Sequence, residues 1–212
     1  MDFQIFPRTA GRLFEDDDIA VHAFAGMRSH ALEPQGSIFL CVVAGSVLVN
    51  GATMRAGMYA CIPHIVRLSG GSEACRVMMV DAKRWRGMFS LGGPVEATGR
   101  LRYIDGCTDT GLIAPPKLGD PCLNALFFPA RTLQTPHTHP SHRVGAILDG
   151  EGYCITDAGE MPMGPGDAWI IPRDVGHHFR TDEHAMRIMV FHPDSEFGPT
   201  DEKHQMLEAT VI

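Results

Sequence analysis

Long apolar segments are missing from this chain of 212 residues. No run approaches the roughly 18 consecutive apolar residues that a membrane-spanning helix requires. The first residues, 1–7, also lack the basic and then apolar layout of a signal peptide. We therefore expect no membrane partner and a cytoplasmic location.

The chain also lacks a recognisable cysteine motif, and it has fewer basic residues than acidic ones. The six cysteines include no Cys-x-x-Cys pair, so the sequence predicts neither a disulfide framework nor a cysteine zinc site. The formal net charge of −7 argues against a nucleic-acid partner, because such a partner needs a basic surface. The length suits one large domain or two small ones.

Histidine, in contrast, is concentrated in one stretch. Residues 136–152 read P-H-T-H-P-S-H-R-V-G-A-I-L-D-G-E-G and contain His137, His139 and His142. On a β-strand, the imidazoles of His137 and His139 would share a face about 7 Å apart, where both can reach one metal ion. The apolar run and the D-G-E-G turn signal that follow predict that this strand ends in a hairpin.

A second histidine segment follows the next apolar run. Residues 168–171 form a strand-like run that stops at Pro172, and His177 and His178 come five and six residues after that proline. Two histidines from one strand and a third from a neighbouring strand make a three-nitrogen face. A catalytic metal ion is commonly bound by three protein ligands, which leaves other coordination positions for water or substrate.

Together the two segments resemble the two signature motifs of the cupin superfamily: H-x-H followed by G-E-G, and then P-G-D-x-x-x-x-P-x-x-x-x-H. The resemblance covers about residues 123–193. It implies that His137 and His139 bind a metal together with His177, which matches the family position better than its neighbour does. The family's glutamate ligand would fall on Arg143 or the next residue, so this chain has no carboxylate there.

The resemblance implies an all-β fold of two tandem cupin barrels, that is, double-stranded β-helix or jelly-roll barrels. The order of turns and strands in the first half recurs in the second half at offsets of 105 to 111 residues. The paired positions are Gly45 and Gly150, Gly57 and Gly166, and Pro63 and Pro172. We therefore expect a bicupin, with an N-terminal barrel in residues 1–100 and a C-terminal, metal-bearing barrel in residues 101–212.

The first half carries no equivalent set of ligands. At these offsets the three ligand positions correspond to Leu32, Pro34 and Leu68. His30 and His64 lie off these positions, and we interpret them as surface or edge residues. The first barrel is therefore expected to lack a metal and to act as a scaffold or a dimer face.

Three further segments carry local predictions. Residues 83–89 predict a short amphipathic helix that closes the first barrel. Residues 108–121 predict an extended arm across the second barrel. Residues 207–212 predict an edge strand or a segment packed against the partner barrel.

The orientation of His142 and Arg143 depends on strand parity. In an unbroken strand, Arg143 shares a face with His137 and His139, so it points inward and His142 points away from the metal. A bulge at Pro140 would instead restore His142 as a fourth ligand, and both alternatives stay open. An inward Arg143 would pair with a carboxylate or another anion beside the metal, whereas its other interpretation is an arginine that extends to the barrel rim.

Other candidates surround this centre. Tyr153 and Cys154 are adjacent, so at most one of them points inward, and Tyr153 is the candidate catalytic residue of the two. Trp169, Phe179 and Phe127 are candidates for an apolar pocket, although each one is also typical of a barrel core.

Imidazoles coordinate as neutral ligands, so three or four of them leave the full +2 charge on the metal. Inside a low-dielectric barrel that charge favours an anionic substrate group. Cupin-like dioxygenases that bind iron with three histidines and no carboxylate are known, and this chain resembles them. The resemblance implies an enzyme, a mononuclear non-haem Fe(II) dioxygenase that acts on a small anionic or enolisable molecule. Zinc, nickel, manganese and copper are the other candidate metals.

Two other functions stay open. A metal-dependent isomerase or lyase of a small keto or sugar acid would need a protein base, for which His142, Tyr153 and His192 are candidates. A non-catalytic barrel would hold a small ligand as a binding or sensor module, because a barrel of this kind does not by itself determine the chemistry. The family also implies a homodimer.

Overall fold

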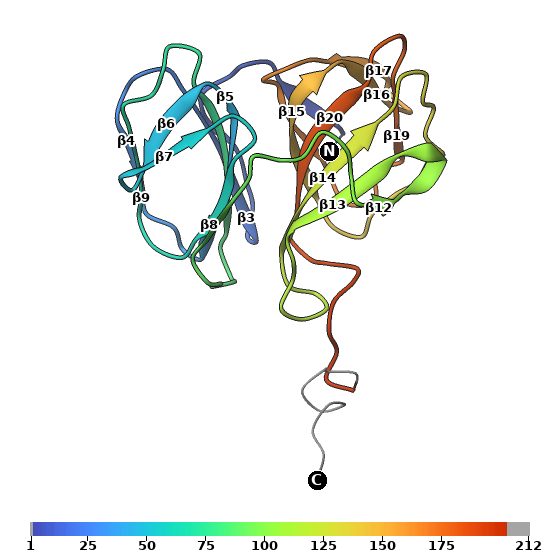
Figure 1. Ribbon diagram of the computed structural model, residues 1–212. Coiled ribbons are helices and arrows are strands. Elements are labelled where there is room, and N and C mark those ends of the chain that lie inside the picture. Colours follow the sequence, from blue (N-terminus) through green and yellow to red (C-terminus); the bar gives the residue numbers. More distant parts are fainter. Residues whose placement is uncertain (1, 203–212) are drawn as a thin grey trace.

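The structure is a computed structural model that describes residues 2–202, and in it the chain forms two β-barrels side by side (Figure 1). The described residues form twenty β-strands and a single short 3₁₀ turn at Ile104–Gly106. This confirms the predicted all-β fold. No described segment forms a helix long and apolar enough to cross a membrane.

The first barrel consists of a six-stranded sheet, in the order β11-β8-β5-β10-β3-β2, and a four-stranded sheet, in the order β4-β9-β6-β7. Its strands are β2 (Gly11–Glu15), β3 (Ile19–Ala25), β4 (His30–Leu32), β5 (Ser37–Ala44), β6 (Ser46–Val49), β7 (Ala52–Arg55), β8 (Tyr59–Ile62), β9 (Val66–Ser69), β10 (Arg76–Ala82) and β11 (Ser90–Gly92).

The second barrel consists of a seven-stranded sheet, in the order β1-β18-β15-β20-β14-β13-β12, and a three-stranded sheet, in the order β17-β16-β19. Its strands are β1 (Gln4–Phe6), β12 (Leu101–Arg102), β13 (Thr108–Ile113), β14 (Cys122–Phe128), β15 (Arg143–Gly150), β16 (Gly152–Thr156), β17 (Gly159–Met163), β18 (Ala168–Ile171), β19 (His177–Arg180) and β20 (Met186–His192).

The first strand of the chain belongs to the second barrel. In β1, Gln4 pairs with Ile170 and Phe6 pairs with Ala168 of β18, in antiparallel fashion. Phe3, just before β1, packs its ring at 6.4 Å from the ring of Trp169 inside this barrel. The expected N-terminal unit of residues 1–100 therefore differs from the structure in its first strand.

Glycine at the end of a long strand lets the chain pass from the large sheet to the small one. Gly45 lies between β5 and β6 with φ 67°, and Gly150 ends β15 with φ 73°. A Cβ atom on Gly150 would lie 1.8 Å from the carbonyl oxygen of Ala185, so only glycine fits there. Because β15 pairs with β18 and β20 whereas β16 pairs with β17 and β19, the predicted hairpin at this turn is wrong, and the turn is a corner between sheets.

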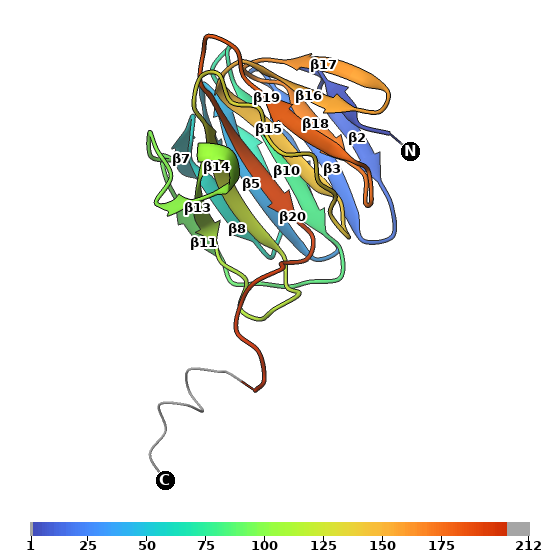
Figure 2. The same ribbon diagram turned by 90° about the vertical axis from the view of Figure 1, so that its right-hand side faces the viewer.

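The two large sheets pack face to face, and their shared core joins the barrels (Figure 2). The rings of Phe39 on β5 and Phe191 on β20 lie 4.9 Å apart in this core. Along β15, Val144 and Ala146 face the shared core, whereas Ile147 faces the interior of the second barrel. Odd-numbered residues at the start of β15 therefore point into the barrel, and this register determines the direction of Arg143.

Two local predictions do not hold. Residues 83–89 form no helix, because Trp85 packs at 5.6 Å on the ring of Phe39 and the backbone N–H of Gly87 donates to Ser37 Oγ. The expected arm at residues 108–121 begins with a sheet strand, β13, which pairs with β14. The prediction for residues 207–212 lies outside the described residues.

All six cysteines are buried free thiols. Burial raises the pKa of the Cys41 thiol to about 12 and that of Cys154 to about 12 as well. At neutral pH these side chains are therefore protonated and act as small apolar residues of the core.

Candidate metal centre

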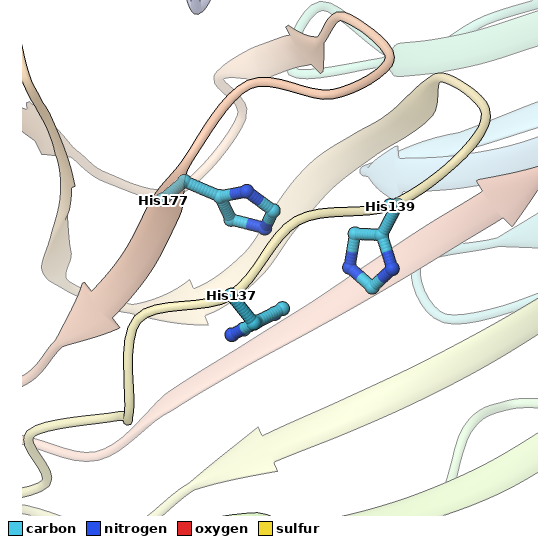
Figure 3. Close-up of side chains that lie close together, drawn as sticks. All are labelled: His137, His139 and His177. Carbon is cyan, nitrogen blue, oxygen red and sulfur yellow. The ribbon is translucent and has the colours of Figure 1, made fainter.

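Three histidine rings gather inside the second barrel: His137, His139 and His177 (Figure 3). One ring nitrogen from each of them lies within 4.8 Å of the others. The ring centroids are 4.6 Å apart for His137 and His177, and 5.0 Å apart for His137 and His139. Nitrogen atoms bound to one ion lie about 3 to 4 Å apart, because each bond is about 2.1 Å long. The rings are therefore close to the arrangement that a shared ion requires.

The backbone holds two of these residues directly against each other. The N–H of His137 donates to the carbonyl of His177 at 3.0 Å, and the N–H of His177 donates back at 2.9 Å. His177 is the first residue of β19, whereas His137 and His139 lie in the loop before β15, which begins only at Arg143. The prediction that the pair sits on a strand is thus wrong. Pro136 and Pro140 bracket the pair, and proline has no N–H to contribute to a sheet ladder.

Hydrogen bonds to the backbone orient the rings. His137 Nδ1 lies 2.8 Å from the carbonyl of Thr135, and His177 Nδ1 lies 2.9 Å from the carbonyl of Val175. A carbonyl oxygen can only accept, so Nδ1 carries the proton in both rings and Nε2 keeps its lone pair. This outer contact is the usual one for a metal-binding histidine, since it fixes the ring and its tautomer. The donor set therefore fits a divalent metal.

The rings are held in their neutral form. Burial, reinforced by Arg143, lowers the pKa of His139 to about 3. Burial also lowers the pKa of His177 to about 4, against the opposing effect of its hydrogen bond to Val175. A neutral imidazole is the form that coordinates a metal, so no proton has to leave these two rings at neutral pH.

A small apolar cavity adjoins the three histidines. Its volume is about 30 Å³, and the rings of Trp169 and Phe179 line it 5.6 Å apart. The third aromatic candidate, Phe127, lies in the core between the barrels instead. The other lining residues are Tyr103, Leu126, Gln134, Arg143, Ile171, Val190 and His192, besides the three histidines. A cavity of this size holds one or two water molecules, so the site excludes bulk water.

Arg143 points into the barrel, which was one of the two predicted alternatives, and lines this cavity. Its side chain is only 3% exposed. One terminal nitrogen, Nη1, donates to Ser141 Oγ at 2.6 Å, and the other, Nη2, donates to Glu196 Oε1 at 2.6 Å. The same Glu196 oxygen lies 3.5 Å from His139 Nδ1. Glu196 therefore offsets the positive charge that Arg143 brings to the site.

The structure does not bring His142 into the cluster. Its Nε2 lies 3.0 Å from Asp16 Oδ2 in the first barrel, and its Nδ1 accepts the backbone N–H of Arg173. Its ring meets the edge of Phe14 at 5.4 Å. Pro140 lies in the loop before β15, and His142 joins the barrels instead of acting as a fourth ligand.

Two other sequence candidates also lie away from the cavity. Tyr153 packs its ring under the guanidinium of Arg180 at 4.4 Å and does not line the metal cavity, whereas its neighbour Cys154 is buried in the barrel core. His178 is half-buried and pairs with Ile155 across the small sheet. His177 is therefore the histidine of this pair that joins the cluster.

Sequence reasoning missed Glu196 and gave little weight to His192. Glu196 follows the last strand by four residues, and no local pattern connects it with Arg143, which lies 53 residues earlier. His192 could have been found by alternation along β20, since Ile188 and Val190 face the barrel interior. Its Nε2 is buried without a partner beside the cavity, and burial lowers its pKa well below the ordinary value.

Comparison with known proteins identifies a cupin domain in the second half of the chain. A family model described as the cupin domain matches residues 127–198, which include all three clustered histidines. This segment is therefore similar to a cupin domain. Within residues 2–202 the second barrel holds the only three-residue group with metal-ligand geometry, and His30 and His64 of the first barrel are exposed. A search of curated sequences gave no match to this chain.

Solved structures of two-barrel cupins share the fold across most of the chain. A Cupin 2 conserved barrel domain protein from Leptotrichia buccalis has a TM-score of 0.59 and 15% identity, covering 90% of this chain and 88% of its own. Salicylate 1,2-dioxygenase from Pseudaminobacter salicylatoxidans has a TM-score of 0.62 and 11% identity, covering 87% and 76%. The 11S globulin from Wrightia tinctoria, described with an auxin-binding site, has a TM-score of 0.57 and 10% identity, covering 84% and 76%. At these identities the likeness concerns the fold alone.

Proposed function

We propose that this cupin is a mononuclear non-haem Fe(II) dioxygenase that acts on a small anionic or enolisable molecule. The observation that carries the proposal is the set of three clustered imidazoles, with no carboxylate among them, beside a buried arginine. Zinc, nickel, manganese and copper also accept imidazole ligands, so the nitrogen set alone does not select iron. Bound there, an Fe(II) ion would supply Lewis-acid and redox chemistry next to the cavity.

The protein groups around the cavity have separable roles in such a reaction. Arg143 would bind and orient an anionic group of the substrate through its guanidinium. Trp169 and Phe179 would hold the apolar part of the substrate and keep water out. His192 has an unpartnered Nε2 beside the cavity, so it can form a hydrogen bond with a substrate hydroxyl, as donor or acceptor according to its tautomer.

The structural neighbours support the enzymatic form of this proposal. Salicylate 1,2-dioxygenase has the same two-barrel fold, and one of its structures is a complex with gentisate, an anionic aromatic acid. The 11S globulin has a similar fold and is described with an auxin-binding site, so this fold also occurs in a protein known for binding a small molecule. The clustered histidines favour the first comparison, because a simple binding barrel needs no three-nitrogen face.

Oxygen consumption tests the proposal. The Fe(II)-loaded protein is mixed with a panel of hydroxylated aromatic acids, diketones and thiols in an oxygen electrode. We expect oxygen uptake with at least one anionic or enolisable substrate, and we expect the His177→Ala variant to lose it. His178→Ala is the matched control, because this histidine is adjacent but outside the cluster, and it should keep the activity. Uptake that survives in His177→Ala would contradict the proposal.

His192 favours a second candidate, an isomerase or lyase of a small keto or sugar acid. Such a reaction needs a group that takes a proton from carbon, and His192, whose buried Nε2 has no partner, lies beside the cavity. The two candidates differ in their use of oxygen. Substrate turnover at an unchanged rate under argon would support the isomerase and contradict the dioxygenase.

A further inference from the structure

The guanidinium of Arg143 is held firmly on one side only. Its Nη1 donates to Ser141 Oγ at 2.6 Å and lies 3.2 Å from the carbonyl of His142. Ser141 in turn donates to Asp194 through a short hydrogen bond. These contacts come from residues next to Arg143 in the chain and from the segment after β20, so they fix the position of the arginine.

The opposite edge of the same guanidinium is incompletely bonded. In arginine, the Nε–H and one N–H of Nη2 point in the same direction. This edge can therefore form a bidentate pair of hydrogen bonds with the two oxygens of a carboxylate. Here Nη2 donates to Glu196 Oε1 at 2.6 Å, but the buried Nε has no partner. A buried donor left without a partner is unfavourable, so an anion that bonds both nitrogens would bind this edge better than Glu196 does.

Glu196 is a weakly held occupant of this edge. Its side chain is 55% exposed, whereas that of Arg143 is 3% exposed. Only one of its oxygens, Oε1, accepts a hydrogen bond from Arg143, and the same oxygen lies 3.5 Å from His139 Nδ1. A substrate carboxylate that bound this edge of Arg143 would take the place of the Glu196 oxygen on Nη2.

We propose that the Nε–Nη2 edge of Arg143 is the carboxylate subsite of this cupin and that Glu196 is an internal anion which the substrate carboxylate displaces. The ligand class is a small monocarboxylate. Its two oxygens would accept hydrogen bonds from Nε and Nη2, so Nε would gain the partner that it lacks. Glu196 is thus a specificity-determining residue, because its departure requires an anion to replace it. The proposal deepens the proposed function and rests on it for the identity of the ligand as a substrate.

Calorimetric titration of the full-length, zinc-loaded protein tests the proposal with acetate, pyruvate and salicylate as probes. Glu196→Gln keeps the size of the side chain and removes its charge. We expect this variant to bind at least salicylate about fivefold more tightly than the parent protein does, because its competitor is neutral. Salicylamide, which lacks the carboxylate, should bind both proteins within a factor of two.

Two further variants sharpen the test. Glu183→Gln is the matched control, since Glu183 forms an exposed pair with Arg131 at 2.6 Å, and it should leave salicylate binding unchanged. Arg143→Lys removes this bidentate edge and should weaken salicylate binding about tenfold. The gain from Glu196→Gln should disappear when the two changes are combined, because both act on one contact.

The outcomes separate this proposal from the proposed function. Unchanged affinity in Glu196→Gln, an equal gain for salicylamide, a gain that persists in Arg143→Lys, or no carboxylate binding to any variant would overturn it. If the protein takes up no metal but Glu196→Gln still tightens salicylate binding, the metal-centred function fails and the subsite stands. If metal binds and Glu196→Gln does not change salicylate binding, the subsite proposal fails and the metal-centred function stands.

Discussion

Acid should destabilise the metal-free protein through His139 and His177. Both rings are buried, and burial lowers their pKa values to about 3 and about 4 from an ordinary value of 6.5. As the pH falls below 6.5, the unfolded chain takes up protons on these imidazoles while the folded chain does not. The stability present above pH 6.5 is therefore lost as the pH falls, and the loss levels off only near pH 3 to 4.

The expected magnitude follows from these values. At pH 5 each ring lies about 1.5 pH units below its unfolded pKa and is still neutral in the fold, which lowers the free energy of unfolding by about 2 kcal/mol per ring. The pair thus accounts for about 4 kcal/mol between pH 7 and pH 5, a large share of the 5 to 15 kcal/mol of an ordinary domain.

Urea unfolding in EDTA at pH 7 and pH 5 measures this loss. In the double variant His139→Gln/His177→Gln, the two titrating groups are gone, so the difference between the two pH values should be about 4 kcal/mol smaller than in the parent protein. His178→Gln removes a half-buried histidine outside the cluster and should leave the larger difference in place. If the double variant keeps the full pH dependence of the parent, the burial argument for neutral rings is refuted.

Three further predictions concern the metal and the scaffold. Zinc affinity, measured by competition with a chelator of known pH dependence, should fall between pH 8 and pH 5 about a thousandfold less than that of three free imidazoles, because His139 and His177 stay neutral over this range. A fall as large as that of three free imidazoles would contradict this. Gly150→Ala should lower the free energy of unfolding, measured with urea, by about 3 kcal/mol or more, because its Cβ would lie 1.8 Å from the Ala185 carbonyl oxygen. The control Gly51→Ala has a similar φ and no atom within 4 Å of the new Cβ, so it should lower the free energy by only about 1 to 2 kcal/mol. Asp16→Asn should lower the free energy of unfolding by about 1 kcal/mol through its bond to His142 without changing the metal content, and metal loss in this variant would argue that His142 supports the site.

Much of the site could be predicted from short-range spacing. The H-x-H pair and the histidine five residues after Pro172 are the three that gather in the structure. Strand parity left the directions of His142 and Arg143 open, because it depended on where the strand begins, and β15 begins only at Arg143. The strand itself starts later than expected, since Pro136 and Pro140 keep the pair in a loop tied to His177 by backbone bonds.

The rest depends on contacts between distant parts of the chain. Glu196 reaches Arg143 from a segment 53 residues downstream, and nothing in its neighbouring sequence predicts that meeting. The first strand crosses to the second barrel by pairing with β18, although the repeat predicted an undivided N-terminal barrel. The segment at residues 83–89 has a helix-like pattern, but seven residues are too few for a stable helix by themselves, and Trp85 packs on Phe39 instead.

Metal analysis of the purified protein tests the central claim most directly. After loading with Fe(II) or zinc and removal of free ion, we expect about one metal per chain in the parent protein and in His178→Ala. We expect essentially none in His137→Ala and in His177→Ala, because each loses one nitrogen of a three-nitrogen face. Full metal retention in both of these variants would contradict the account.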